Sequence, residues 1–386
     1  MIPYGRQDIS EADVEAVVRA LKSDFLTQGP MVPRFEEALA HKVSARHAIA
    51  VNSATSALHI AVSALGLGKG DLLWTSPITF VASANCARYV GADVDFVDID
   101  PDTFNMSPQA LAFKLEEAKA AGRLPKVIVP VHMGGQSAAM KEISDLVRPL
   151  GIRILEDASH AIGGEYEGLP VGAGLYSDVT VFSFHPVKIV TTAEGGVAVT
   201  NDEQLAQKMA LLRSHGITRD PGQMTQSPDG PWYYQQIELG WNYRMTELQA
   251  ALGFSQLDRL DQFVDRRNAL ADRYDDELTK LPLALPGRQA QTRSSFHLYI
   301  IRLLNPASDQ HRLVFQRLRD EGIGVNIHYI PVHLQPYYRD LGFDVGDFPV
   351  AEEYYSRAIS IPLYHSLDDV EQSKVISAVA SAVCDE

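Results

Sequence analysis

A lysine, Lys188, ends the run Ser-Phe-His-Pro-Val-Lys at residues 183–188, shortly after the apolar residues 179–182. Small and polar residues follow it in the run Thr-Thr-Ala-Glu-Gly-Gly at residues 191–196. A single lysine is usually a solvated surface charge. A lysine that leaves a buried strand into such a turn can instead hold a carbonyl compound as a Schiff base. We therefore interpret Lys188 as a candidate catalytic residue.

Two other segments supply groups that would complement this lysine. Asp157 follows the apolar residues 152–155, where its carboxylate could face a heterocyclic nitrogen and keep it protonated. An aspartate at a strand end is more often a turn or cap residue. Residues 52–58, Asn-Ser-Ala-Thr-Ser-Ala-Leu, join an apolar run to a helical one, so their N–H groups could bind a phosphate. Plain N-capping by Ser53 or Thr55 is about as good an explanation of this segment.

Two more side chains could contribute to the same site. The hydroxyl of Ser183, five residues before Lys188, could reach the same phosphate. Phe80 could stack on a ring, although an aromatic residue there is more often part of the core. A lysine, a carboxylate, a helix N-terminus and an aromatic ring are together what pyridoxal phosphate requires. Each signal is weak alone, and the ordered set is what predicts the cofactor.

The elements that must position these groups alternate between short apolar runs and helical patterns. We predict strands at residues 48–51, 72–76, 94–97, 127–131, 152–155, 179–184 and 196–200, and helices at residues 55–65, 108–121 and 138–147. Such alternation indicates an α/β fold with a mostly parallel sheet between helices. Ligands of such sheets bind beyond the carboxyl ends of the strands, which is where Asp157 and Lys188 fall.

The rest of the chain does not show this regular alternation of strands and helices. Its pattern predicts a capped helix at residues 10–22, a mobile loop at 221–232, a long helix at 245–281, strand-like runs at 296–303 and 325–330, and a helix at 309–321. We therefore expect an N-terminal arm and large domain at residues 1–245. The connecting helix and a small α/β domain would form residues 246–386.

Composition excludes several classes of protein. The 386 residues include 34 basic and 49 acidic ones, a formal charge of −15 that argues against a nucleic-acid or anionic membrane surface. Cys86 and Cys384 are the only cysteines, so no disulfide framework or cysteine zinc site is expected, as suits a cytoplasmic protein. The first residues lack the apolar core of a signal peptide, and no stretch of about 18 apolar residues predicts a membrane span.

Across nearly its whole length the sequence resembles the sugar aminotransferases of the DegT/DnrJ type. Besides the runs named above, the matching segments are residues 3–5, 25–30, 214–216, 240–247 and 328–329. The resemblance implies a fold-type I aminotransferase, with a mostly parallel seven-stranded sheet in the large domain. It also implies a homodimer with shared active sites, in which Asn242 reaches the site of the partner.

The resemblance implies roles for individual residues as well. Lys188 would form the Schiff base and Asp157 would pair with the pyridine nitrogen. The cofactor contacts would be Ala54, Thr55, Ser56, Phe80, Asp157, His160, Ser183, Lys188 and Asn242, with no metal. The substrate contacts would be Tyr4, Phe25, Thr27, His185, Asn242, His328 and Tyr329. Domain packing is an equal alternative for most of these substrate contacts, and His185 could equally fix the backbone.

The implied reaction moves the amino group of L-glutamate to C4 of a nucleotide-linked 4-keto-6-deoxy sugar. Within the family, residues 52–58, 183–188 and 214–219 are most similar to the branch that makes pseudaminic acid from a UDP-linked sugar. Another nucleotide 4-keto sugar, or a non-catalytic regulator with this fold, are the alternatives. A dinucleotide oxidoreductase and a metal hydrolase fit poorly, because no G-x-G-x-x-G opens a helix and the histidines are scattered.

Overall fold

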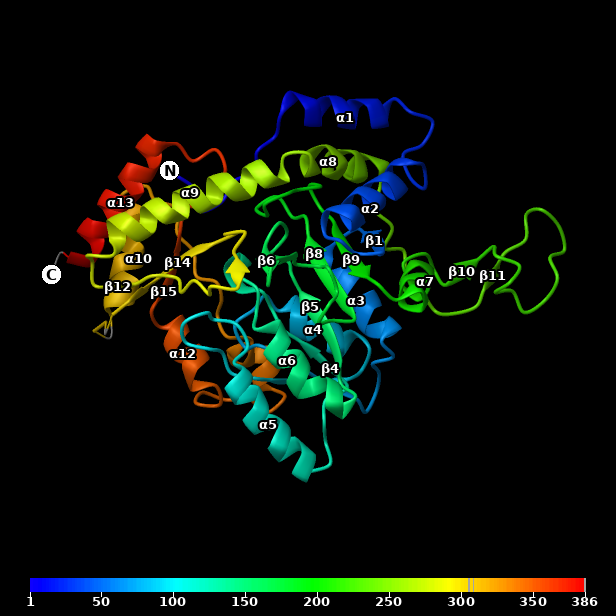
Figure 1. The fold of residues 1–386 in the computed structure, drawn as a ribbon, viewed down its shortest axis with the longest axis horizontal. Coiled ribbons are helices and arrows are strands. Elements are labelled where there is room, and N and C mark those ends of the chain that lie inside the picture. The colour runs from blue at the N-terminus through cyan, green and yellow to red at the C-terminus, as the bar shows by residue number, and fades with distance from the viewer. Residues whose placement is uncertain (305, 308, 385–386) are drawn as a thin grey trace.

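The computed structural model describes residues 1–304, 306–307 and 309–384. At its centre is a seven-stranded sheet in the order β1-β9-β8-β5-β4-β2-β3 (Figure 1). Its strands are β1 (His47–Val51), β2 (Leu72–Thr75), β3 (Asp93–Phe96), β4 (Val127–Val129), β5 (Arg153–Asp157), β8 (Val179–Ser183) and β9 (Gly196–Thr200). Only β9 pairs antiparallel with its neighbours. The predicted mostly parallel sheet, and all seven of its strands, are confirmed.

Helices cover both faces of this sheet because its buried strands alternate their side chains between two cores. Val181 and Leu155 pack with α3 (Ala54–Ala64), α4 (Ala82–Tyr89) and α7 (Glu203–Leu212) on one face. On the other face lie α2 (Met31–Lys42), α5 (Pro108–Ala120), α6 (Met140–Val147) and α8 (Glu247–Leu257). The predicted helices at 55–65, 108–121 and 138–147 are confirmed.

A second apolar core lies around the three-stranded sheet β12-β14-β15. The strands are β12 (Leu283–Ala284), β14 (Tyr299–Leu303) and β15 (Ala358–Ile361). The helices near them are α9 (Leu260–Leu278), α10 (Gln310–Asp320) and α13 (Asp369–Cys384), while the short α11 (Pro336–Arg339) and α12 (Pro349–Tyr355) pack against the first core. The domain boundary between residues 245 and 246 stays a prediction.

Two predicted elements differ from the structure. The single helix expected at 245–281 is two helices, α8 and α9, because Arg259 between them leaves the helical conformation and binds the N-terminal arm. The strand expected at 325–330 is a single bridge between Asn326 and Ser360. The next amide, Ile327 N–H, donates to the side chain of Asn326 (2.9 Å), so the ladder does not continue.

Short strands complete the fold. A small sheet joins β6 (Glu165–Tyr166), β7 (Leu169–Pro170) and β13 (Thr292–Arg293). A hairpin of β10 (Ile217–Thr218) and β11 (Gln235–Gln236) projects from the body of the molecule (Figure 1). The loop predicted at 221–232 lies at the tip of this hairpin and is irregular, as expected; its mobility stays a prediction. None of the described helices combines the length and hydropathy needed to cross a bilayer.

The N-terminal helix α1 (Glu11–Leu21), predicted at 10–22, is held to the α8–α9 junction by a buried carboxylate. Asp13 accepts hydrogen bonds from Ser255 Oγ (2.6 Å), Gln256 Nε2 (2.7 Å) and Arg259 Nη2 (2.6 Å). Burial alone would raise the pKa of Asp13, but hydrogen bonds from Ser10, Ser255 and Gln256 outweigh it, and the pKa lies below its ordinary value. Asp13 is therefore ionised in the folded state.

We expect Asp13→Ala to lower the free energy of unfolding by about 2–3 kcal/mol at pH 7. It leaves Ser10 N–H and Ser255 Oγ without their acceptor and removes the more buried of the two carboxylates that bind Arg259. Asp8→Ala is the matched control, since the half-buried Asp8 binds the same guanidinium (2.6 Å) and should cost less. The contribution of Asp13 is present above its ordinary pKa and is lost as pH falls through the lower folded value. Urea unfolding at pH 7 and pH 3 measures both effects; a loss that is equal at the two pH values would contradict the assignment.

Candidate active site

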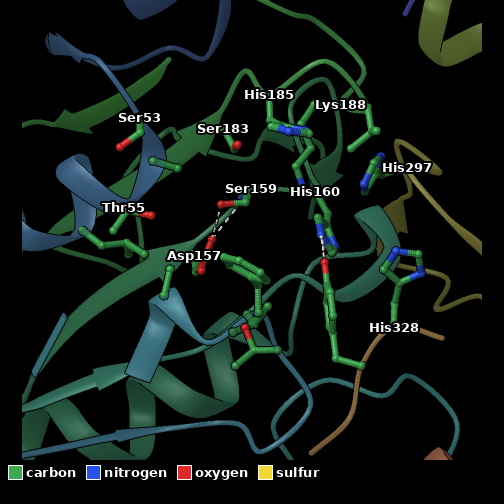
Figure 2. A pocket seen from close by; sticks show the side chains of 18 of the residues that line it. Ser53, Thr55, Asp157, Ser159, His160, Ser183, His185, Lys188, His297 and His328 are labelled. Carbon is green, nitrogen blue, oxygen red and sulfur yellow. Dashed lines mark hydrogen bonds between the residues drawn. The ribbon is translucent and has the colours of Figure 1, made fainter. Parts of the chain in front are cut away.

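A cavity of about 470 Å³ opens at the carboxyl ends of β5 and β8. Figure 2 shows Ser53 and Thr55 on one side of it, Asp157 near the centre, and Lys188, His297 and His328 on the other side. The predicted residues that line it are Tyr4, Ala54, Thr55, Phe80, Asp157, His160, Ser183, His185, Lys188, His328 and Tyr329. The structure therefore brings together residues that are more than 300 positions apart in the sequence.

The N-terminus of α3 forms one end of the cavity. Ser53 is the N-cap and accepts a hydrogen bond from Ser56 N–H (3.1 Å). The first two helical N–H groups, those of Ala54 and Thr55, have no intrahelical acceptor, and the positive end of the helix dipole faces the same way. Gly196 lets β9 approach this turn, since a Cβ there would overlap Ala54 N. This end of the cavity suits an anion such as a phosphate.

Asp157 lies at the last position of β5, and its carboxylate is fixed by neighbouring donors. Oδ1 accepts hydrogen bonds from Ser159 Oγ (2.6 Å) and Ser159 N–H (3.1 Å), and Oδ2 accepts one from Ser83 Oγ (2.6 Å). Only 5% of the residue is exposed. A carboxylate held in this way can accept a further hydrogen bond from a cationic ring nitrogen in the cavity.

The amine of Lys188 has no hydrogen bond or ion pair with any residue in the described ranges. Burial lowers the pKa of Lys188 from its ordinary 10.5 to about 8, although the negative charge of Asp157 acts in the opposite direction. The backbone turn is closed by a hydrogen bond from Lys188 N–H to His185 O (2.9 Å). A large fraction of this amine is therefore unprotonated near pH 8, which is the state that attacks a carbonyl.

Two of the histidines beside Lys188 are held in place by hydrogen bonds between their ring nitrogens and other residues. His160 Nδ1 accepts a hydrogen bond from Gly134 N–H (3.3 Å), and its Nε2 is 3.0 Å from the hydroxyl of Tyr329. His328 Nδ1 is 2.8 Å from Ser360 Oγ. Burial and then the charge of Lys188 lower the pKa of both, that of His328 to about 3. Both imidazoles are therefore neutral, and Lys188 is the one lysine or arginine among the described residues that line the cavity.

Four of the predicted residues do not line this cavity. The hydroxyl of Ser56 donates to Asn52 Oδ1 (2.7 Å) inside the helix cap. Ser56 is in the first turn of α3, near the anion-binding end of the cavity, but its hydroxyl is therefore already engaged. Phe25 and Thr27 are exposed near the start of α2. Asn242 is exposed at the base of the hairpin, outside the cavity of its own chain. The proposed roles of these four residues stay predictions.

Sequence reasoning missed Ser83, Ser159, His297 and Asn326. Ser159 carried a usable signal, because a serine two residues after a strand-end aspartate commonly bonds back to it. Ser83 and Asn326 reach the site from distant segments, and no spacing rule connects them to Lys188. His297 lines the cavity beside His160, with ring centroids 4.5 Å apart, although it is 109 positions away from Lys188.

The cavity residues form the donor set that pyridoxal phosphate requires. An unpaired amine, a fixed carboxylate and a helix N-terminus with hydroxyl groups occur in one cavity, and the exposed ring of Phe80 lines its wall. The residues present therefore fit this cofactor.

Comparisons with known proteins agree with this chemistry. The family described as "DegT/DnrJ/EryC1/StrS aminotransferase family" matches residues 7–380. The UDP-4-amino-4,6-dideoxy-N-acetyl-beta-L-altrosamine transaminase of Campylobacter jejuni is 38% identical, over 95% of this chain and 94% of that protein.

Solved structures are similar over the same range. Helicobacter pylori PseC, described as an aminotransferase involved in the biosynthesis of pseudoaminic acid, has a TM-score of 0.91 and 32% identity over 99% of each chain. The PLP-form of the putative sugar aminotransferase Spr1654 from Streptococcus pneumoniae has a TM-score of 0.89 and 31% identity, over 99% of this chain and 98% of that one.

Proposed function

The chain belongs to the DegT/DnrJ/EryC1/StrS aminotransferase family and is a pyridoxal phosphate-dependent sugar aminotransferase, and from that premise we propose its substrates. It transfers the amino group of L-glutamate to C4 of a UDP-linked 4-keto-6-deoxy-N-acetylhexosamine, as in pseudaminic acid synthesis. The 38% identity to the UDP-4-amino-4,6-dideoxy-N-acetyl-beta-L-altrosamine transaminase of Campylobacter jejuni supports this sugar. The main structural support for this reaction is the unpaired amine of Lys188, which lies in the same cavity as Asp157 and the N-terminus of α3.

Three groups of this chain would hold the cofactor. Lys188 would bind its aldehyde carbon, and Asp157 would accept a hydrogen bond from its ring nitrogen. Ala54 and Thr55 N–H groups, with the hydroxyls of Thr55 and Ser183, would bind its phosphate. Phe80 would lie against the ring, and His160 would contact the cofactor from the side of Lys188. When bound, pyridoxal phosphate provides the electron sink that makes the α-proton of an amino acid removable.

Lys188 moves the protons in both half-reactions. Its Nζ takes the α-proton of glutamate in the first and delivers a proton to C4 of the sugar in the second. The lowered pKa suits this exchange, because a group that titrates near the working pH both accepts and returns a proton readily. Asp157 keeps its charge buried beside the cofactor site, where it favours the protonated ring nitrogen. The products are 2-oxoglutarate and the 4-amino sugar.

The nucleotide sugar and the dimer are parts of the same proposal. Tyr4, His185, His328 and Tyr329 line the cavity and would contact the sugar, while Phe25 and Thr27 would bind it from the dimer interface.

Asn242 would act in the site of the partner protomer. It is exposed outside its own cavity. The rings of its two sequence neighbours, Trp241 and Tyr243, stack on each other, with centroids 5.7 Å apart and planes at 10°. His59 of α3 packs on Trp241 with a centroid distance of 4.1 Å, so the base of the hairpin is fixed.

The lowered pKa of Lys188 predicts how fast the apoenzyme takes up pyridoxal phosphate. Only the neutral amine attacks the aldehyde, so below the pKa the rate should rise about tenfold per pH unit. With a pKa of about 8 the rise should level off above that pH. Stopped-flow absorbance between pH 6 and 10 measures it, with Nα-acetyl-lysine as the control that keeps rising toward 10.5. A protein rate that keeps rising up to pH 10, as the control does, would contradict the lowered pKa.

The substrate proposal is tested by product identification. The enzyme is incubated with UDP-, dTDP- and GDP-linked 4-keto-6-deoxy sugars and with glutamate, aspartate or alanine as donor, and the aminated product is identified by mass and NMR. We expect glutamate with the UDP-linked β-L-arabino 4-keto sugar to give the highest kcat/KM. A clear preference for another nucleotide, sugar or donor would replace that part of the proposal. No amination with any pair would overturn it.

A further inference from the structure

Four imidazoles line the cavity (Figure 2). That of His185 is exposed, whereas those of His160, His297 and His328 are buried, and these three differ in which of their nitrogen atoms are engaged. Both nitrogens of His160 have partners, Gly134 N–H and the Tyr329 hydroxyl. Both nitrogens of His328 also have partners, since Ser360 Oγ is 2.8 Å from Nδ1 and Asn326 Nδ2 is 3.3 Å from Nε2. These two rings are therefore committed to holding the protein in place.

His297 is the exception. In the described ranges neither of its ring nitrogens has a hydrogen-bond partner, and Nδ1 is fully buried. The residue is 4% exposed and lines the cavity, so the remaining access of its ring is through Nε2 on the cavity side. A buried N–H without an acceptor is costly, which favours the tautomer that carries its hydrogen on Nε2. The ring therefore offers one unused donor to the cavity.

The charge state of His297 restricts what this donor can bind. Burial, followed by the charges of Lys188, His160 and Arg267, lowers the pKa of His297 well below its ordinary value. A neutral imidazole adds no ion-pair energy to a carboxylate, but it can donate to a hydroxyl or carbonyl oxygen. Of the two substrates in the proposed reaction, the sugar is the one with neutral oxygens around its reacting carbon.

The backbone of His297 is fixed from two sides, so the point from which its ring enters the cavity is fixed. The buried Arg267 donates through Nη1 to Phe296 O (3.1 Å) and Leu363 O (2.9 Å), without an acidic partner in the described residues. From the other side, Gly135 packs so closely that a Cβ there would lie 2.9 Å from His297 N. A donor held this way loses little entropy when a ligand binds.

We propose that His297 Nε2 donates a hydrogen bond to an oxygen of the sugar ring, next to the carbon that receives the amino group. This inference rests on the proposed function, and it assigns His297 to the amino acceptor and not to the amino donor. His297 is then a specificity-determining residue for the second half-reaction. His160 and His328 have no free ring nitrogen to donate to the sugar; besides lining the cavity, they hold Tyr329 and the cavity wall in position.

The experiment compares the two half-reactions of the holoenzyme in His297→Leu and His297→Gln. Absorbance follows the loss of the pyridoxal form with glutamate and its return with the keto-sugar. We expect His297→Leu to lower kcat/KM for the keto-sugar by about 10–100-fold, and to do so at least about tenfold more than for glutamate, as is typical when a buried polar contact to a substrate is removed. His297→Gln keeps a donor near the position of Nε2 and should recover most of the loss.

A binding measurement separates a substrate contact from a general defect. Calorimetry with the keto-sugar nucleotide and the pyridoxal form, a pair with no amino group to transfer, should give a Kd about tenfold higher for His297→Leu than for the parent enzyme. Equal losses in both half-reactions, an unchanged Kd, or no recovery with glutamine would overturn the role of His297. If the parent enzyme ran neither half-reaction, the proposed function itself would be wrong, and the two failures are thus distinguishable.

Discussion

Lys188→Ala should lower turnover by about 10⁴-fold or more, because it removes both the covalent attachment point of the cofactor and the group that moves the protons. None of the other described residues that line the cavity carries a side-chain amine. His160 and His328 use both ring nitrogens in bonds to the protein, and burial keeps their pKa values and that of His297 low. The measurement is steady-state transamination with glutamate and the best keto-sugar, together with the absorbance of bound pyridoxal phosphate.

The control for this variant is Lys69→Ala, which removes an exposed lysine far from the cavity and should leave turnover within about twofold, as is usual for surface substitutions. A small amine such as methylamine should restore part of the activity of Lys188→Ala by replacing the lost base in solution. Substantial turnover by the variant without added amine would refute the role of Lys188.

Asp157→Asn should lower turnover by about 10²–10³-fold, the loss usually seen when one preorganised electrostatic contact to a developing charge is removed. The amide is close in size and can keep the hydrogen bond from Ser159 N–H, so the cavity should persist and still bind the cofactor. What is lost is the negative charge that favours a protonated ring nitrogen. Turnover and the dissociation constant for pyridoxal phosphate are measured on the same sample.

Ser159→Ala is the matched control for Asp157→Asn. It removes one neutral donor to Oδ1 while the charge and the bond from Ser83 remain, so we expect a loss of about tenfold or less. If Asp157→Asn retained near-normal turnover, Asp157 would not be the partner of the ring nitrogen. If the variant lost the cofactor completely, its role would be in binding and not in catalysis.

The sheet and the core of the site could be predicted from the sequence for one physical reason. Strands that are buried on both faces are short continuous apolar runs, and their carboxyl ends meet at one edge of a parallel sheet. Asp157 ends β5, and Ser183 ends β8 five residues before Lys188, so locating the strands also located these groups. The helix N-cap at Ser53 could be predicted for a similar reason, because the apolar strand pattern changes to a helical pattern at residues 52–58.

The parts that sequence reasoning missed depend on contacts between distant segments. His297 reaches the cavity because Arg267 and Gly135 fix its backbone, and neither contact has a local pattern. The break between α8 and α9 is stabilised by Asp8 and Asp13, about 250 residues away. The side chain of Asn326 accepts the hydrogen bond of Ile327 N–H, which ends the strand pairing there. The strand-forming residues around Asn326 give no indication of this local hydrogen bond.

The central claim is that the amine of Lys188 binds pyridoxal phosphate covalently. Reduction of the reconstituted enzyme with borohydride, followed by protease digestion and mass spectrometry, tests it most directly. We expect one phosphopyridoxyl group per chain, on the peptide that contains residues 183–188. A label on another lysine, or no label on fully reconstituted enzyme, would contradict it.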